Sequence, residues 1–422
     1  MKTQSVVAAS GAALLLLGSA GFASAHVNKR AAHKPVTITL GGWAAYANNN
    51  VQSMENFLKP FERKYPWIHV VYRPVPGNYE TVLKTEYVAG TAADVVALNN
   101  GGQASPFIDA GDVIPLNSYL ASSGLSVKSF YPGTTSLFTY KGKIYAIPRD
   151  QDVLGLFYNK TMFAQAGIKS PPTTWAQLAA DAKKLTNPAK HIYGIGIDPA
   201  EPYWAEFVYQ AGGSIFNANM TKLTLNTPAA LKGFSFYVNL YKNGYAAQPT
   251  QVGATWSGQS FGIARVAMTI EGGWLIGAMK ASWPGVKYGV APLPKGPGGA
   301  ATMTFPVGWA ISKSCKNPQA AWDLINYMTN TAQRGWVKGT QALPTLVSNL
   351  AMPFFTKNPL WAPLISTLPE AQAWTFPNGF DQWSSTTLAN ETLKAVQGQE
   401  SAAQALKNLQ TTGSQVLASS GG

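Results

Sequence analysis

The chain has 422 residues, which is long enough for two lobes with separate hydrophobic cores. Charged residues make up only 12% of it, and the 32 Lys and Arg outnumber the 19 Asp and Glu. The basic excess is spread along the chain without a run of like charges, which argues against a nucleic-acid-binding protein. The low charge content favours a secreted protein with few ionisable groups, or one adapted to an acidic habitat where carboxylates are protonated.

The N-terminus has the features of a secretory signal peptide. Lys2 supplies positive charge, residues 6–17 form an apolar core, and residues 23–25 (Ala-Ser-Ala) have the small-x-small form of a cleavage site. The predicted signal peptide is therefore 1–25. Its apolar core is shorter than the about 20 residues that span a membrane, and no cysteine follows the cleavage site that could carry a lipid. We expect an exported protein, extracellular or periplasmic.

Alternating strand and helix patterns follow the predicted cleavage site. Apolar alternation predicts strands over 36–40 and 68–72, and a continuous apolar run predicts a third strand over 93–98. Apolar residues at helical spacing over 54–61 predict a helix that ends at residues 65–67, although Pro60 is expected to kink or shorten it. The same spacing predicts another helix over 79–87. This order is typical of a parallel, doubly wound sheet of the α/β class.

Aromatic and amide side chains follow two of these predicted strands. Trp43 comes after the first strand and a pair of glycines, which let the backbone approach a ligand closely. Tyr46 lies three residues further on, and Asn99 and Asn100 follow the third strand. Because ligands bind such sheets beyond the carboxyl ends of the strands, we expect these side chains at a ligand site.

A polar turn, a buried strand and a helix are predicted over residues 145–167. The apolar run at 155–159 has the length of a strand that is buried on both faces. The residues of this stretch that carry a resemblance are Pro148, Asp150, Gly155, Leu156, Phe157, Tyr158, Asn159 and Phe163. With them the stretch resembles the signature of the extracellular solute-binding proteins of family 1, which feed sugar ABC importers. Arg149 and Gln165 depart from that pattern.

Further blocks resemble the family in the same order along the chain. Residues 201–204, Glu201-Pro202-Tyr203-Trp204, are similar to the loop of maltose-binding proteins whose acid and aromatic residues touch the sugar, and Asp152 matches a sugar-binding acid there. Residues 261–274 end in Trp274, and residues 308–311 contain Gly308 and Trp309; both tryptophans match ring platforms of the family. Trp383 closes a loop before a predicted C-terminal helix.

The resemblance implies a two-lobed periplasmic-binding-protein fold of type II with the ligand between the lobes. The implied N-terminal lobe comprises 36–150 plus 305–348, and the implied C-terminal lobe comprises 153–304 plus 349–422. Chain crossings between the lobes are expected near 150–153, 304–308 and 347–353.

The implied function is that of a monomeric ABC-transporter substrate-binding protein, without enzymatic activity or cofactor, that delivers a maltose- or maltodextrin-like sugar to a membrane permease. Aromatic rings would cover the apolar face of a sugar while polar groups bond its hydroxyls. The candidate ligand-binding residues are Trp43, Tyr46, Asn99, Asn100, Asp150, Asp152, Glu201, Tyr203, Trp204, Trp274, Gly308, Trp309 and Trp383.

Two other classes of function stay open. Asp152 and Glu201 could form the carboxyl pair of a glycoside hydrolase. Residues 258–262 satisfy G-x-S-x-G, but all four histidines precede Ser260, whereas that hydrolase motif needs one after it. A binding protein for a glycerophosphodiester, a polyamine or ferric ion is the other alternative. No common metal motif is present, and Cys315 is expected to be a passive residue.

Overall fold

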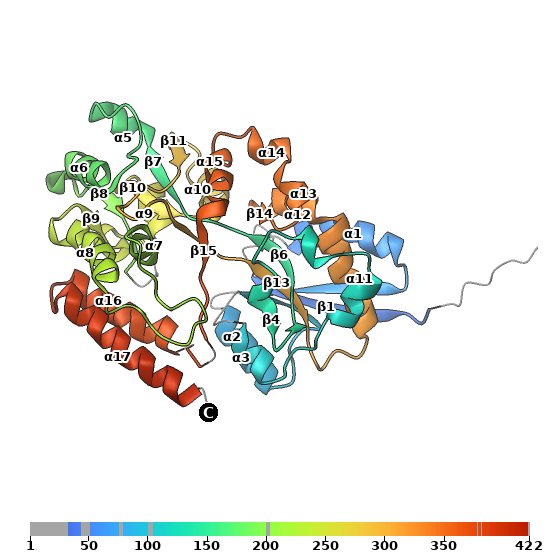
Figure 1. The fold of residues 1–422 in the computed structure, drawn as a ribbon. Helices are drawn as coiled ribbons and strands as arrows, with labels where there is room; N and C mark the ends of the chain where they lie inside the picture. Colours follow the sequence, from blue (N-terminus) through green and yellow to red (C-terminus); the bar gives the residue numbers. More distant parts are fainter. Residues whose placement is uncertain are drawn as a thin grey trace, which may run out of the picture. The chain divides into compact units, whose positions relative to one another are not determined.

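The computed structural model describes residues 33–43, 51–75, 79–99, 104–199, 203–377, 379–380 and 382–420, with the side chains of residues 51, 52 and 420 excepted. The chain divides into Met1–Lys34 and Pro35–Gly422, and the elements below all belong to the second unit (Figure 1). The predicted signal peptide, 1–25, lies outside the described residues.

The first sheet has six strands in the order β14-β6-β13-β3-β1-β2. Strands β1 (Val36–Trp43), β2 (Ile68–Val75) and β3 (Val95–Asn99) are parallel, and α1 (Val51–Lys64) and α2 (Tyr79–Val88) lie between them in the chain. Beyond β3 the sheet continues with β13 (Val307–Ile311), β6 (Ile147–Gln151) and β14 (Leu343–Pro344). Strand β13 runs antiparallel to β3 and to β6, and β14 runs antiparallel to β6. The predicted α/β order is confirmed.

Helix α1 continues through Pro60 and ends at Lys64, directly before the predicted end at residues 65–67, so the proline does not shorten it. Apolar residues on both sides of the proline are buried: Leu58 is 2% exposed and Phe61 is 0% exposed. This burial offsets the backbone hydrogen bond that a proline cannot donate.

The second sheet has five strands in the order β11-β7-β10-β8-β9. Strand β10 (Val266–Glu271) is parallel to β8 (Tyr193–Gly196), which is parallel to β9 (Ala246–Ala247). Strand β7 (Gly155–Asn159) runs antiparallel between β10 and β11 (Tyr288–Ala291). The sequence predicted β7 as a strand buried on both faces, and the structure confirms it, since Leu156 and Phe157 are both inaccessible to solvent.

The helices of this part of the chain lie in the segments between its strands. They are α5 (Lys160–Gln165), α6 (Trp175–Leu185), α7 (Ala205–Gln210), α8 (Pro228–Lys242), α9 (Ser257–Gly262) and α10 (Trp274–Ser282). Thr174 caps α6 by accepting a hydrogen bond from the backbone N–H of Gln177, and Thr227 caps α8 in the same way from Ala230.

Two connections between the sheets run side by side. The chain leaves β6 at Gln151 and enters β7 at Gly155, and it returns through β12 (Thr302–Thr304) to β13. Val153 forms an antiparallel bridge with Thr304, and the backbone N–H of Phe305 donates to the carbonyl of Asp152 at 2.9 Å. These segments coincide with two expected crossings, while the lobe boundaries 36–150 plus 305–348 and 153–304 plus 349–422 stay a prediction.

A third connection follows β14. The Gln151 side-chain amide donates to the Pro344 carbonyl at 3.0 Å, and the Thr345 hydroxyl donates to the Pro148 carbonyl at 2.8 Å. Three short helices come next, α13 (Val347–Leu350), α14 (Pro353–Thr356) and α15 (Ala362–Ser366), and then β15 (Ala371–Ala373), which pairs with β12. The crossing segments are therefore fastened to one another by hydrogen bonds.

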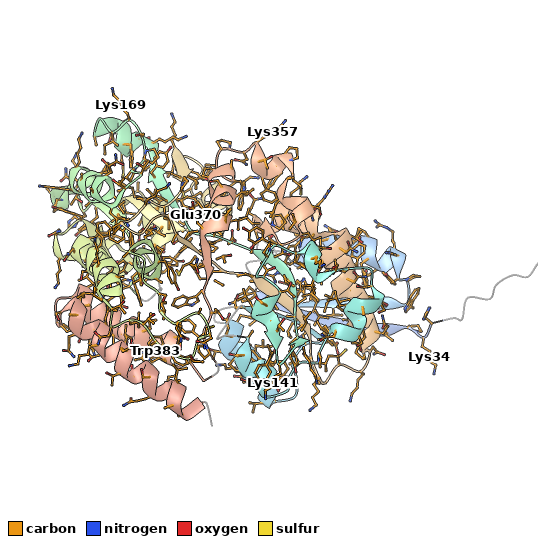
Figure 2. The ribbon with its side chains drawn as sticks, in the orientation of Figure 1. Lys34, Lys141, Lys169, Lys357, Glu370 and Trp383 are labelled. Carbon is orange, nitrogen blue, oxygen red and sulfur yellow. The ribbon has the colours of Figure 1, made fainter. Side chains whose placement is uncertain are left out.

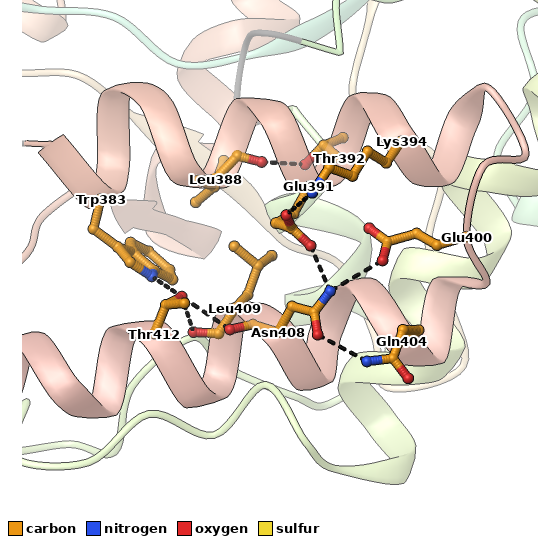
Figure 3. Close-up of polar contacts among 10 residues, drawn as sticks. All are labelled: Trp383, Leu388, Glu391, Thr392, Lys394, Glu400, Gln404, Asn408, Leu409 and Thr412. Atoms are coloured by element: carbon orange, nitrogen blue, oxygen red, sulfur yellow. Dashed lines mark hydrogen bonds and ion pairs between the residues drawn. The ribbon is translucent and has the colours of Figure 1, made fainter.

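The C-terminal part packs as two helices against α8. Helices α16 (Leu388–Val396) and α17 (Ala402–Ser420) lie along each other below α8 (Figure 1). Between them the Asn408 amide donates to Glu391 at 2.7 Å and to Glu400 at 3.0 Å (Figure 3). In the part of the chain that the structure describes, no helix combines the length and the apolar composition that a membrane span needs.

Glu206, in the first turn of α7, is a carboxyl group buried in the second hydrophobic core. It is inaccessible to solvent, and neither carboxyl oxygen has a hydrogen-bond partner from another described residue. Burial raises its pKa well above the ordinary value. The folded state therefore holds this proton more tightly than the unfolded chain does, so the contribution of Glu206 to stability is fully present below the unfolded pKa and is lost as the pH rises towards the folded pKa.

We expect Glu206→Gln to remove the loss of stability that ionisation of Glu206 causes as the pH rises. The free energy of unfolding of the variant, relative to the wild type, should increase from about pH 4.5 upwards by up to about 1.4 kcal/mol per pH unit. Urea unfolding followed by circular dichroism between pH 4 and 8 measures the difference. Glu370→Gln, at an exposed site, is the control and should follow the wild type; parallel pH profiles for wild type and Glu206→Gln would contradict the assignment.

Candidate functional site

A cavity of about 450 Å³ lies at one edge of both sheets. Its volume falls in the range of about 300–1,000 Å³ that is usual for small-molecule sites. The lining combines four aromatic rings with two carboxylic acids, an amide and a hydroxyl: Trp43, Asn99, Asp198, Tyr203, Trp256, Ser257, Glu271 and Trp274.

The sheet topology places these side chains together. Trp43 and Asn99 are the last residues of β1 and β3, which are parallel neighbours. Glu271 is the last residue of β10, and Asp198 follows β8, its parallel neighbour, by two residues. Each sheet therefore presents the carboxyl ends of two adjacent strands to the cavity, which is where α/β sheets bind ligands.

Trp43 is held from the protein side by two tyrosines. Its ring centroid lies 4.4 Å from that of Tyr79, and its backbone carbonyl accepts a hydrogen bond from the Tyr72 hydroxyl at 2.9 Å. Near it, the Asn99 amide donates to a carboxyl oxygen of Glu80. These contacts fix a wide aromatic face and an amide group at the same edge of the sheet.

Trp274 is fixed by Glu271 and by two glycines between them. The indole N–H donates to Oε2 of Glu271 at 2.7 Å, and the ring of Phe305 meets Trp274 edge-on with centroids 6.1 Å apart. A Cβ atom at Gly273 would lie 2.3 Å from the Trp361 ring, and one at Gly272 would lie 2.3 Å from Trp274 itself. Only glycine fits these two positions, so the Glu-Gly-Gly-Trp sequence has a steric explanation.

Asp152 lies behind this turn and outside the cavity lining. Its Oδ1 accepts a hydrogen bond from the backbone N–H of Gly273 at 3.1 Å, and the residue is 8% exposed. Burial, together with the neighbouring Asp150, raises the pKa of Asp152 well above its ordinary value. In this structure Asp152 therefore links the first crossing to the turn that carries Trp274.

Asp150 is also buried, in an ion pair with Arg149. Nε of Arg149 lies 2.8 Å from Oδ2 of Asp150, which also accepts a hydrogen bond from the Trp336 indole at 2.6 Å. The guanidinium lies 4.6 Å from the ring centroid of Trp309, 5.0 Å from that of Trp336 and 5.7 Å from that of Trp43. This arginine cluster, Arg149 and Asp150 with those three tryptophans, connects the cavity wall to the first crossing.

Of the candidate site residues, the structure brings Trp43, Asn99, Tyr203 and Trp274 to the cavity. The other aromatic candidates are core residues outside its lining: Trp204 packs edge-on against Phe234, Trp309 lies in the arginine cluster, and the Trp383 indole donates to the Thr412 hydroxyl of α17 at 3.0 Å (Figure 3). Gly308 lies inside the first sheet, 2.8 Å from Ala146 if given a Cβ atom. Tyr46, Asn100 and Glu201 lie outside the described residues.

Four lining residues were not among the sequence candidates: Asp198, Trp256, Ser257 and Glu271. The rule that selected Trp43 and Asn99 also applies to Asp198 and Glu271, since both follow or end strands of a parallel pair. Trp256 directly precedes α9, and Ser257 is the first residue of that helix. No strand pattern in the sequence ends at this position. Their position depends on how α9 packs on β10, which local sequence does not reveal.

The serine and the cysteine that were considered as catalytic residues lie in structural environments. Ser260 lies within α9, is inaccessible to solvent, and donates its hydroxyl to the Trp256 carbonyl at 3.3 Å. Burial raises the pKa of the Cys315 thiol to about 12, so a reactive thiolate is disfavoured. The described residues contain no group of three or more His, Cys, Asp or Glu that could hold a metal ion.

Comparison with known proteins agrees with this geometry. Residues 44–335 match the model of the family described as bacterial extracellular solute-binding protein. A putative binding protein of Brucella abortus is 29% identical over 346 residues, which are 78% of this chain and 81% of the relative. A maltotriose-binding protein of Pyrococcus abyssi is 24% identical over 303 residues, 69% of this chain and 62% of that protein.

Solved structures share the fold. A solute-binding protein of an ABC transporter from Thermotoga lettingae, bound with α-D-tagatose, is 26% identical with a TM-score of 0.81, covering 91% of this chain and 100% of its own. A Mycobacterium tuberculosis protein in complex with glycerophosphocholine is 19% identical with a TM-score of 0.79, covering 92% and 99%. The fold is therefore that of the two-domain periplasmic binding proteins, as the sequence predicted.

The arginine cluster generates a stability prediction. Arg149→Met removes the cation and leaves the Asp150 carboxylate buried, which we expect to lower the free energy of unfolding by about 3–5 kcal/mol. The double variant Arg149→Met with Asp150→Asn removes both charges and should lose clearly less than the sum of the single losses. Denaturant unfolding of the three variants measures this coupling, and strictly additive losses would show that the two side chains do not interact.

Proposed function

The chain belongs to the bacterial extracellular solute-binding proteins, and we propose that it binds a mono- or oligosaccharide in the cavity described above and delivers it to a membrane permease of an ABC transporter. The observation that carries the proposal is the lining, in which aromatic rings from both sheets surround acids, an amide and a hydroxyl. A sugar needs both kinds of surface, since its C–H face is apolar and its rim is a row of hydroxyls.

The ligand-binding residues of the proposal are Trp43, Asn99, Tyr203 and Trp274, together with the acids Asp198 and Glu271. The rings would cover sugar faces, and the carboxylates and the amide would bond hydroxyl groups. The crossing segments give the protein a place to bend, so that ligand binding can be coupled to closure of one lobe on the other. The closed form would then be the one that the permease recognises.

A maltose- or maltodextrin-like ligand is the finer proposal. The maltotriose-binding protein of Pyrococcus abyssi supports it as a sequence relative, and the sequence of residues 201–204 resembles the maltose-binding proteins. Export through a cleaved signal peptide at 1–25, residence outside the membrane, and action as a monomer without enzymatic activity belong to the same proposal.

A glycerophosphodiester is the second candidate, because a structural neighbour binds glycerophosphocholine. That neighbour is 19% identical, so it supports the fold and not the ligand. Among the described residues, the lining contains two carboxylic acids and no Lys, Arg or His, whereas phosphate is commonly bound by clustered basic side chains. The cavity therefore favours the sugar.

A thermal-shift screen tests the proposal. A ligand at one hundred times its Kd stabilises the folded state by about 2.7 kcal/mol, which raises the melting temperature measurably. We expect glucose, maltose or longer maltodextrins to raise it and glycerophosphocholine to leave it unchanged. The reverse result would replace the proposal by the second candidate, and release of shorter saccharides during incubation would show a glycoside hydrolase instead.

Trp274→Ala should weaken binding of the sugar found in this screen by more than about 1 kcal/mol, roughly a fivefold or larger rise in Kd, because a ring that covers the ligand is lost. Isothermal titration calorimetry measures the change. Trp67→Ala is the matched control, since Trp67 precedes β2 at the opposite edge of the sheet and is outside the cavity lining. Equal affinities for Trp274→Ala and the control would remove Trp274 from the binding site.

A further inference from the structure

The charge of the cavity is opposite to that of the chain. Lys and Arg outnumber Asp and Glu by 32 to 19, which gives a formal net charge of +13. The described lining nevertheless contains two acids, Asp198 and Glu271, and no basic residue. The labelled lysines Lys141, Lys169 and Lys357 lie on the outside of the molecule in Figure 2, and all three are exposed.

The sequence segments next to the lining residues contain no basic side chain. The segments that follow Trp43 and Asn99 in the chain, residues 44–50 and 100–103, contain no Lys, Arg or His, and the segment before Tyr203, residues 200–202, contains none either. Arg149 lies 5.7 Å from the ring centroid of Trp43, but it is 3% exposed and its guanidinium forms the ion pair with Asp150. It is outside the cavity lining.

The aromatic residues add to the same preference. Trp43, Trp256 and Trp274 line the cavity together with Tyr203, and the faces of indole and phenol rings attract cations through their quadrupoles. Acids and aromatic faces at one small cavity therefore form an environment that stabilises a positive charge.

We infer that the cavity selects its ligand by charge and that the physiological ligand is a saccharide bearing a protonated amine. This inference rests on the proposed sugar-binding function and names the chemical class within it. The ammonium group would lie between the carboxylates of Asp198 and Glu271 and against the face of a tryptophan, while the remaining hydroxyls bond as in a neutral sugar. Uronic acids and sugar phosphates would be rejected, because their anionic groups would face the two carboxylates.

Matched saccharides test the inference. Each set contains a glucose disaccharide, its 2-amino-2-deoxy counterpart and its uronic acid counterpart, one set linked α-1,4 and one linked β-1,4. Isothermal titration calorimetry is run at about pH 6, above the ordinary pKa of carboxyl groups and below that of amines. We expect the amino sugar to bind at least tenfold more tightly than the neutral sugar, the uronic acid to bind more weakly than both, and the preference to shrink as salt is added.

Variants locate the preference at the cavity. Glu271→Gln keeps an oxygen that can accept the Trp274 indole N–H, and Asp198→Asn keeps the side-chain size, so each removes charge with little change of shape. Both should reduce the ratio of amino to neutral affinity at least threefold. Glu370→Gln removes an exposed charge that is outside the cavity lining and should keep the wild-type ratio.

The outcomes separate the two proposals. If the neutral sugar binds as tightly as the amino sugar in every set that binds, the charge inference is wrong and the sugar-binding function stands. If neither variant at the cavity changes the ratio, the inference is also wrong, because the preference then arises elsewhere. If the sugars fail to bind whatever their charge, while glycerophosphocholine binds, the proposed function itself fails.

Discussion

The binding site depends on one constraint of sheet geometry. Parallel strands place their carboxyl ends at the same edge, and this chain does so twice, with β1 and β3 in one sheet and β8 and β10 in the other. The residues at those ends, Trp43, Asn99, Asp198 and Glu271, line one cavity. Their side chains can be polar or aromatic because the strands behind them, such as Val95–Leu98 of β3, supply the buried apolar surface that holds the sheet.

Much of the fold could be predicted because it follows from local patterns. The buried run at β7 and the alternation of strands and helices from β1 to β3 depend on residues close together in the chain. The same rule applied to strand ends identified Trp43 and Asn99. Trp204 and Trp309 could not be placed from the sequence. A motif gives the position of a ring in the chain, but it does not show whether side chains distant in sequence will cover that ring. Both rings are covered by other aromatic side chains.

Arg149 shows the converse. It departs from the family pattern at a position where the signature has an apolar residue, yet it is as buried as the apolar residue would be. The ion pair with Asp150 and the neighbouring tryptophan rings hold the guanidinium, and a guanidinium tolerates burial better than an ammonium group would. Because Trp43 belongs to both the cluster and the cavity wall, the cation that replaces an apolar residue lies next to a ring of the site.

The distribution of acids joins stability to recognition. The chain has few of them, and several of those it has are placed where ionisation is costly: Glu206 lies in a core and Asp152 behind the Trp274 turn, and burial raises the pKa of both. Because these carboxyl groups are more easily protonated in the folded state, lowering the pH does not reduce their contribution to the free energy of unfolding. This is the behaviour expected in the acidic habitat that the composition suggests. Asp198 and Glu271 differ because they face the cavity, where a ligand can supply the opposite charge. The chain as a whole is basic, whereas the two acids of the lining make the proposed binding site acidic. The site can therefore distinguish ligands by their charge, which the shape of the site alone would not do.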